Sequence, residues 1–299
     1  MSETVLELRQ VEAGYGRAAL VLRGFSVSVR AGEIVCLVGP NGAGKSTVLK
    51  VASGLLAPRR GSVVLAGRDV TGRTPQELLK QGLAHVLQGH SVFREMTVEE
   101  NIRLGGYTVR DSGLLARRIE AVKETFPVVA ERWKTIAGLL SGGQQKQVEF
   151  ARALMLEPKV VLLDEPSMGL DPKTTETVFA QIARMRSLRV AVLLVEQNAR
   201  RALQMADIGC VLDLGRVHIS GRAAELLDDP RLGALYLGGS VARTVATDAA
   251  PTEAAPTPTE AAPTPTEAAP TSAEAAPTPA AAAGPPAVPP VGTASTAPD

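Results

Sequence analysis

The chain has 299 residues, and its formal net charge is +1, from 32 basic and 31 acidic side chains. Proteins that hold nucleic acid through phosphate contacts usually show a basic excess or a basic stripe, so we expect no nucleic-acid partner. The two cysteines, Cys36 and Cys210, lie inside apolar runs, which predicts buried thiols in a reducing compartment rather than a disulfide framework.

Neither the start of the chain nor any internal run has the pattern of a membrane segment. The first ten residues carry acids and lack the apolar core of a signal peptide. The longest uninterrupted apolar run, residues 190–195, is far shorter than the roughly 18 residues that suggest a membrane span. We therefore expect a soluble chain whose membrane role, if any, comes through a partner.

Two kinds of strand are expected. Alternating apolar and polar residues predict half-buried strands of an antiparallel sheet at residues 5–9, 26–30 and 62–66. Uninterrupted apolar runs, typical of strands buried on both faces of a parallel sheet, stand at residues 34–38, 160–163 and 190–195. The sequence predicts an α/β fold whose core carries an antiparallel side sheet.

A glycine-rich segment follows the run at 34–38 and matches the pattern G-x-x-x-x-G-K-[ST], with the residues Gly39, Pro40, Asn41, Gly42, Ala43, Gly44, Lys45 and Ser46, followed by Thr47. A helix is predicted from Lys45 to residue 53, with Gly54 as its stop. Backbone N–H groups of such a loop face phosphate oxygens, and the helix N-terminus adds its positive end. We expect Lys45 to contact the β- and γ-phosphates of ATP and Ser46 to ligate Mg²⁺.

A helical pattern then occupies about residues 89–152, which we expect to be an inserted subdomain. Thr97 and Glu100 form a capping box. A further helical pattern at residues 114–126 is expected to stop at Pro127.

Residues 140–144 read Leu-Ser-Gly-Gly-Gln. Ser141 and Gln144 make a second capping box, so a helix is expected to begin here and to run to about residue 156. Gly142 and Gly143 give a backbone that can approach an anion at the positive end of that helix.

The apolar run at 160–163 delivers two adjacent carboxylates, Asp164 and Glu165. Ligands bind at the carboxyl ends of strands in open α/β sheets. We expect Asp164 to hold the magnesium, directly or through water, and Glu165 to act as the general base that orients the attacking water.

From about residue 241 the composition changes. A seven-residue unit, TEAAPTP, begins at Thr252 and recurs with small changes. It supplies no apolar a and d positions, and its prolines remove helical donors, which excludes a coiled coil. Residues 241–299 are predicted to be a disordered, partly polyproline-II tail after a folded domain at 1–240.

The phosphate loop, the Ser-Gly-Gly-Gln helix start and the Asp-Glu-Pro segment, in this order, resemble the ATP-binding subunits of ABC transporters over roughly residues 4–239. The resemblance implies a P-loop NTPase core and a head-to-tail dimer. Each ATP would lie between one subunit's phosphate loop and the other's residues 141–144. It also implies that Tyr15 stacks on adenine, that Gln88 joins the magnesium shell and senses the membrane partner, and that residues 168–171 cross the dimer interface.

One position departs from the wider family. Most members place a histidine after the strand at 190–195, where it hydrogen-bonds the γ-phosphate, but here Gln197 stands at that position. A glutamine amide can still donate a hydrogen bond but cannot become cationic. The segment Val-Glu-Gln-Asn, together with residues 96–101 and the segment 236–239, is similar to one of the two ATPase subunits of branched-chain amino acid importers.

The resemblance implies an ATPase at the cytoplasmic face of the plasma membrane. Its partners would be permease subunits, a second ATPase subunit (a related chain or a second copy) and, indirectly, an external substrate-binding protein. Relatives that import urea or short amides share these motifs. Two alternatives are a soluble ABC-type machine on ribosomes or DNA, whose relatives carry two cassettes or a long coiled-coil insertion, and a P-loop kinase, which leaves the Ser-Gly-Gly-Gln helix unexplained.

Overall fold

Strand β3 (Ile34–Val38) is buried along its whole length, and its side chains alternate between two separate hydrophobic clusters. Ile34, Cys36 and Val38 belong to one cluster, whereas Val35 and Leu37 belong to the other. This division explains the uninterrupted apolar run, because a strand between two cores has no solvent-facing side.

The computed structural model describes residues 3–16, 19–89 and 92–232, all of which fall within one unit of the chain, Met1–Thr244. Its strands are β1 (Thr4–Ala13), β2 (Leu22–Arg30), β3, β4 (Arg60–Leu65), β5 (Arg68–Asp69), β6 (Leu83–Val86), β7 (Val160–Asp164), β8 (Ala191–Val195), β9 (Ile208–Asp213) and β10 (Arg216–Arg222). Its helices are α1 (Lys45–Ala52), α2 (Pro75–Lys80), α3 (Val98–Gly105), α4 (Ser112–Thr125), α5 (Pro127–Glu131), the 3₁₀ turn η1 (Ala137–Leu139), α6 (Gly142–Leu154), α7 (Pro172–Ser187), α8 (Ala199–Met205) and α9 (Ala223–Leu227).

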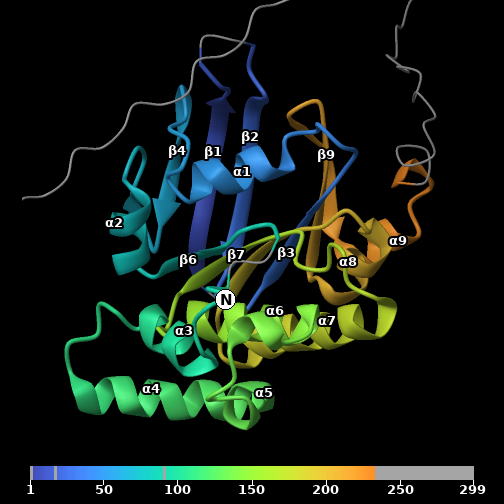
Figure 1. The fold of residues 1–299 in the computed structure, drawn as a ribbon. Helices are drawn as coiled ribbons and strands as arrows, with labels where there is room; N and C mark the ends of the chain where they lie inside the picture. Colours follow the sequence, from blue (N-terminus) through green and yellow to red (C-terminus); the bar gives the residue numbers. More distant parts are fainter. Residues whose placement is uncertain (1–2, 17–18, 90–91, 233–299) are drawn as a thin grey trace, which may run out of the picture. The chain divides into compact units, whose positions relative to one another are not determined.

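The strands form two sheets (Figure 1). The side sheet is antiparallel where its strands pair, in the order β2-β1-β4-β5. The core sheet has the order β10-β9-β3-β8-β7-β6 and is parallel except for the β9–β10 pair. The predicted α/β core with an antiparallel side sheet is therefore confirmed.

Strand order places the chemistry-bearing segments together. The carboxyl ends of parallel neighbours lie at the same edge of a sheet. The ends of β3, β7 and β8 lead directly to the phosphate loop, to Glu165 and to Glu196, and β6 ends two residues before Gln88. Helix α1 contacts both β1 of the side sheet and β7 of the core sheet, which fixes the start of the helix beside that edge.

The helical region follows the sequence expectation with two differences. Both capping boxes form, at Thr97 with Glu100 and at Ser141 with Gln144. Pro127 does end the preceding pattern, but it also opens the short helix α5, because proline fits the first turn of a helix, where its missing N–H is not needed. Helix α6 ends two residues before the expected residue 156.

Some elements of the structure were not predicted, and part of the prediction lies outside the described residues. The elements without a prediction are strands β5, β6, β9 and β10 and helices α2, α7, α8 and α9. The proposed boundary near residue 240 and the tail at 241–299 lie outside the described residues. Among the helices that the structure describes, none is both long enough and apolar enough to cross a membrane.

His85 in β6 gives the fold a testable acid sensitivity. Neither ring nitrogen has a hydrogen-bond partner among the described residues, and burial lowers the pKa of His85 to about 4 from 6.5. The stability that neutral His85 contributes is present above pH 6.5 and is lost as the pH falls toward 4, because the unfolded chain binds the proton first. Relative to His85→Leu, the parent should lose about 2–3 kcal/mol more unfolding free energy between pH 7 and pH 4.5.

Urea unfolding at the two pH values measures this difference. Replacing the exposed His218 by leucine is the matched control, and it should leave the pH dependence of the parent in place. Equal pH dependence in both leucine variants would contradict the role given to His85.

Candidate functional site

The phosphate loop begins where its backbone comes very close to the backbone of strand β9. Gly39 has a φ of 154°, and a Cβ built at this residue would lie 2.2 Å from the carbonyl oxygen of Leu212 in β9. Gly44 precedes helix α1 with a φ of 106°, and no side chain caps the first turn of that helix. The first-turn N–H groups of α1 are therefore open toward an anion, which is the arrangement that phosphate oxygens need.

Lys45 lies inside this loop. The residue is 5% exposed, and its Nζ donates to the carbonyl oxygens of Gly39 at 2.8 Å and Pro40 at 3.0 Å. Burial lowers the pKa of Lys45, whereas the carboxylates of Glu165 and Asp164 act in the opposite direction. The lysine thus places a positive charge beside the carbonyl oxygens at the start of the loop.

Ser46 and Asp164 meet across 118 residues of sequence. The Ser46 Oγ donates to the Asp164 Oδ1 at 3.2 Å. Asp164 is 7% exposed, and burial raises the pKa of its carboxyl group, opposed by the hydrogen bond from Ser46. A hydroxyl and a carboxylate oxygen in contact form a set of hard oxygen ligands, which fits Mg²⁺.

Glu165 stands one residue beyond the end of β7 in a conformation that is unusual for glutamate. Its φ is 46°, and its backbone N–H donates to the carbonyl oxygen of Val195 at 2.9 Å. The Gln88 Nε2 donates to the Glu165 Oε2 at 3.2 Å and lies 3.1 Å from the Met168 Sδ. Left-handed φ values in residues other than glycine cost about 1–3 kcal/mol and cluster at functional sites.

Tyr15 lies against α1. Its hydroxyl is 3.3 Å from the Thr47 Oγ1 and accepts from the Lys50 Nζ at 3.4 Å. Tyr15 is 46% exposed, and the Lys50 ammonium lies over its ring, 5.3 Å from the ring centre. The structure thus brings Tyr15 beside the first turns of α1, as stacking on a base next to bound phosphates would require.

The segment 141–144 stands apart from these groups. Ser141 and Gln144 hydrogen-bond to each other's backbone N–H, at 3.1 and 3.4 Å, and among the described residues no hydrogen bond joins them to the phosphate loop. A Cβ at Gly143 would lie 2.1 Å from the Thr174 Cγ2 of α7, so only glycine allows this close packing of α6 on α7. The segment is not brought into the same cluster within one chain.

Two polar residues, Glu196 and Gln197, follow the end of β8. Gln197 is exposed, and no side-chain hydrogen bond is found for it in the described part of the chain. Its neighbour Glu196 is 1% exposed and accepts from the backbone N–H groups of Ser167 at 3.0 Å and Gln197 at 3.2 Å. Burial raises the pKa of Glu196.

Sequence reasoning gave Glu196 no role, although an acid directly after a buried strand is the signal that marked Asp164 and Glu165. Through Ser167, Glu196 connects the end of β8 to the loop that follows Glu165. Over residues 3–16, 19–89 and 92–232, no group of three or more His, Cys, Asp or Glu side chains is arranged to hold a metal ion.

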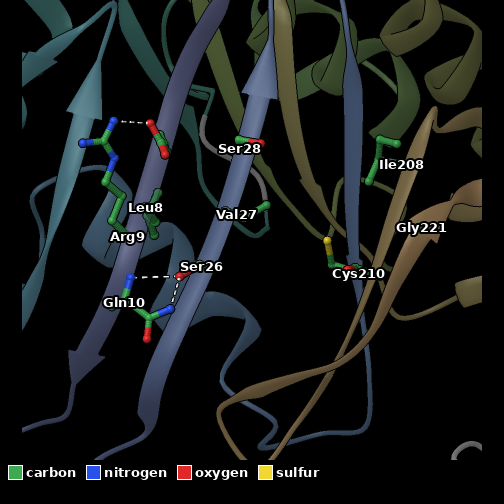
Figure 2. A pocket seen from close by; sticks show the side chains of 11 residues that line it. Leu8, Arg9, Gln10, Ser26, Val27, Ser28, Ile208, Cys210 and Gly221 are labelled. Carbon is green, nitrogen blue, oxygen red and sulfur yellow. Dashed lines mark hydrogen bonds and ion pairs between the residues drawn. The ribbon is translucent and has the colours of Figure 1, made fainter.

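A cavity of about 560 Å³ lies between β1 and β2 on one side and β9 and β10 on the other (Figure 2). It contains the Glu7–Arg9 ion pair and the hydrogen bonds between Gln10 and Ser26, and none of its lining residues comes from the phosphate loop. Burial raises the pKa of the Cys210 thiol at its edge to about 12. That thiol is therefore protonated at neutral pH and unreactive, as expected for a core cysteine.

Known proteins that are similar to this chain include ATP-binding proteins of transport systems. The family model described as ABC transporter matches residues 22–168. The high-affinity branched-chain amino acid transport ATP-binding protein BraG of Pseudomonas aeruginosa is 40% identical over 235 residues, which are 79% of this chain and 100% of BraG. The lipopolysaccharide export system ATP-binding protein LptB of Acidithiobacillus ferridurans is 36% identical over 239 residues, 80% of this chain and 98% of LptB.

Among solved structures, the ADP conformation of MJ1267, described as an ATP-binding cassette of an ABC transporter, superposes with a TM-score of 0.72 at 29% identity. The match covers 79% of this chain and 100% of that structure.

Proposed function

Because this chain belongs to the family of ABC transporter ATP-binding proteins, we propose that it powers the import of branched-chain amino acids. Members of this family bind ATP and couple its hydrolysis to transport, working with membrane permease subunits and partner ATPases. The observation that carries the catalytic part of the proposal is the pair of contacts Ser46–Asp164 and Gln88–Glu165, which bring the ends of separate strands together.

The phosphate-binding roles are assigned to residues 39–47. Their backbone N–H groups surround the phosphate oxygens, and the buried Lys45 ammonium exchanges its bonds to Gly39 and Pro40 for the β- and γ-phosphates. The exposed ring of Tyr15 receives the adenine.

Ser46, Asp164 and Gln88 are the residues that would hold Mg²⁺. The oxygen donors of Ser46 and Asp164 are already in contact, and Gln88 adds an amide from the neighbouring loop. Bound Mg²⁺ would neutralise charge that develops on the β- and γ-phosphate oxygens.

Glu165 serves as the general base. Its carboxylate orients a water for attack on the γ-phosphate and takes up the proton. Gln88 holds one oxygen of that carboxylate, and the backbone bond to Val195 fixes the residue at the end of β7. Gln197, exposed one residue beyond Glu196, donates its amide to the γ-phosphate.

A second ATPase subunit completes the site. Residues 141–144 bond only locally within the described chain, which is what a segment that serves the ATP of a facing subunit requires. We assign residues 168–171 to the crossing of the same interface, and the loop from Gln88 to Met96 to the contact with the permease. The assembly would stand at the cytoplasmic face of the plasma membrane and receive its cargo from an external binding protein.

The cargo assignment rests on the likeness to BraG and on the motifs around residues 96–101 and 196–198. Urea and short amides are the alternative cargoes. The likeness to LptB at 36% makes export the competing direction.

Uptake in living cells tests cargo and direction together. In cells of the source organism that carry Lys45→Ala in this protein, uptake of labelled leucine should fall, whereas uptake of labelled urea and acetamide should be unchanged. Lys80→Met, a change of an exposed lysine at the end of α2, is the matched control and should leave leucine uptake in place.

A fall in urea or acetamide uptake with normal leucine uptake would contradict the cargo and retain the transport ATPase. Unchanged uptake of all three, with less lipopolysaccharide at the cell surface, would contradict import itself.

A further inference from the structure

Helix α6 carries a buried charge that the roles above do not use. The Lys146 side chain is 4% exposed and that of Glu149 is fully buried, and their charged groups are 2.6 Å apart, one helical turn along α6. The Lys146 Nζ also donates to the carbonyl oxygen of Gly89 at 2.7 Å, 57 residues earlier in the chain. One ammonium group therefore joins the helix to the loop that follows β6.

Gly89 is the residue directly after Gln88. Its φ of 86° marks a tight turn, and the Gln88 amide next to it donates to Glu165. Gln88 itself is exposed, so its backbone position depends on what holds the loop around it. The hydrogen bond from Lys146 to the Gly89 carbonyl is such an anchor.

The energetics favour a role for this lysine beyond packing. Taking two charges out of water is costly, and replacing a buried ion pair by apolar residues of similar size is often neutral or stabilising. Lys146 makes two contacts that an apolar side chain could not make, and the bond to Gly89 is the one that reaches another segment of the chain.

We propose that Lys146 is a positioning residue for hydrolysis, which holds the Gly89 carbonyl and thereby keeps the Gln88 amide against Glu165. The proposal rests on the proposed function, because it takes the roles of Gln88 and Glu165 from there. Since α6 begins at Gly142, the same lysine makes the placement of Gln88 depend on the helix whose start faces the partner ATPase.

A double-mutant cycle between Lys146 and Gln88 tests this directly. In the full chain, Lys146→Met should lower kcat for ATP hydrolysis by roughly 10- to 100-fold, the effect of a small misplacement of a catalytic group, while the KM for ATP stays close to the parent value. In the Gln88→Ala background, Lys146→Met should have no further effect on kcat. Lys146→Arg, which keeps the positive charge and its N–H donors, should recover most of the parent rate.

Lys123→Met is the matched control, because Lys123 pairs with Glu120 at the same i,i+3 spacing but both side chains are more exposed, and it should leave kcat unchanged. Thermal unfolding of each variant identifies those that fail to fold. If Lys146→Met fails to fold, the double variant Lys146→Met with Glu149→Leu, which removes the buried carboxylate together with its cation, takes its place in the cycle. An equal fall in kcat on Lys146→Met with and without Gln88 would overturn the proposal, as would a parent-like kcat in Lys146→Met. Failure of the proposed catalytic role is seen separately, as continued hydrolysis in Glu165→Gln.

Discussion

Replacing Glu165 by glutamine is expected to lower the rate of ATP hydrolysis by roughly 10²- to 10⁴-fold, the usual effect of removing a general base. Glutamine keeps the size of the side chain and can still contact Gln88, but it cannot accept the proton of the attacking water. The phosphate loop and the Ser46–Asp164 contact are unchanged, so ATP should bind as before. Phosphate release and ATP titration on the same sample measure the two effects.

Glu157→Gln is a close control for this substitution. Glu157 also has a left-handed backbone, with a φ of 50° against 46° for Glu165, but it pairs with Arg118 away from the loop. The control separates the effect of a strained glutamate from that of the catalytic carboxylate. Hydrolysis near the parent rate in Glu165→Gln would refute the assignment of the base.

Replacing Lys45 by alanine should weaken ATP binding by about 10- to 100-fold, which is the value of a charge-assisted hydrogen bond of about 1.5–3 kcal/mol. Hydrolysis should fall further, because the charge that forms on the transferred phosphate loses its nearest cation. The substitution also removes the two bonds that Lys45 makes to Gly39 and Pro40, so the loop loses an internal support. Titration with a slowly hydrolysed ATP analogue measures the affinity.

Lys80→Met serves as the control here also, since Lys80 is an exposed lysine at the end of α2. Its affinity for the analogue should change much less than that of Lys45→Ala. Parent-like affinity in Lys45→Ala would contradict the phosphate role of the lysine.

The sequence was most informative where local rules determine structure. The bounds of β3 were predicted to the residue, because an apolar run ends at a glycine that only a tight turn explains. Both capping boxes form as predicted, since they involve side chains three residues apart. The contact of Ser46 with Asp164 was expected from their roles, but its geometry depends on strand order, which local patterns do not encode.

The residues that sequence reasoning missed act over long separations. Lys146 and Gly89 are 57 residues apart, and Glu196 reaches Ser167 across 29 residues. A lysine within a helix is ordinarily a solvated residue, so nothing local marks Lys146 as buried. β6 escaped prediction because it has only four residues, one of them His85.

The burial of both faces of β3 also fixes the position of the phosphate loop along the strand direction. A slip of one residue would exchange Ile34, Cys36 and Val38 with Val35 and Leu37 between the two clusters, and it would move Gly39 by about 3.3 Å. Both clusters oppose that slip, and the close approach of Gly39 to Leu212 opposes it again from β9. The position of Lys45 thus depends on aliphatic packing on both faces of β3, so substitutions in β3 that preserve side-chain volume should leave the loop in register.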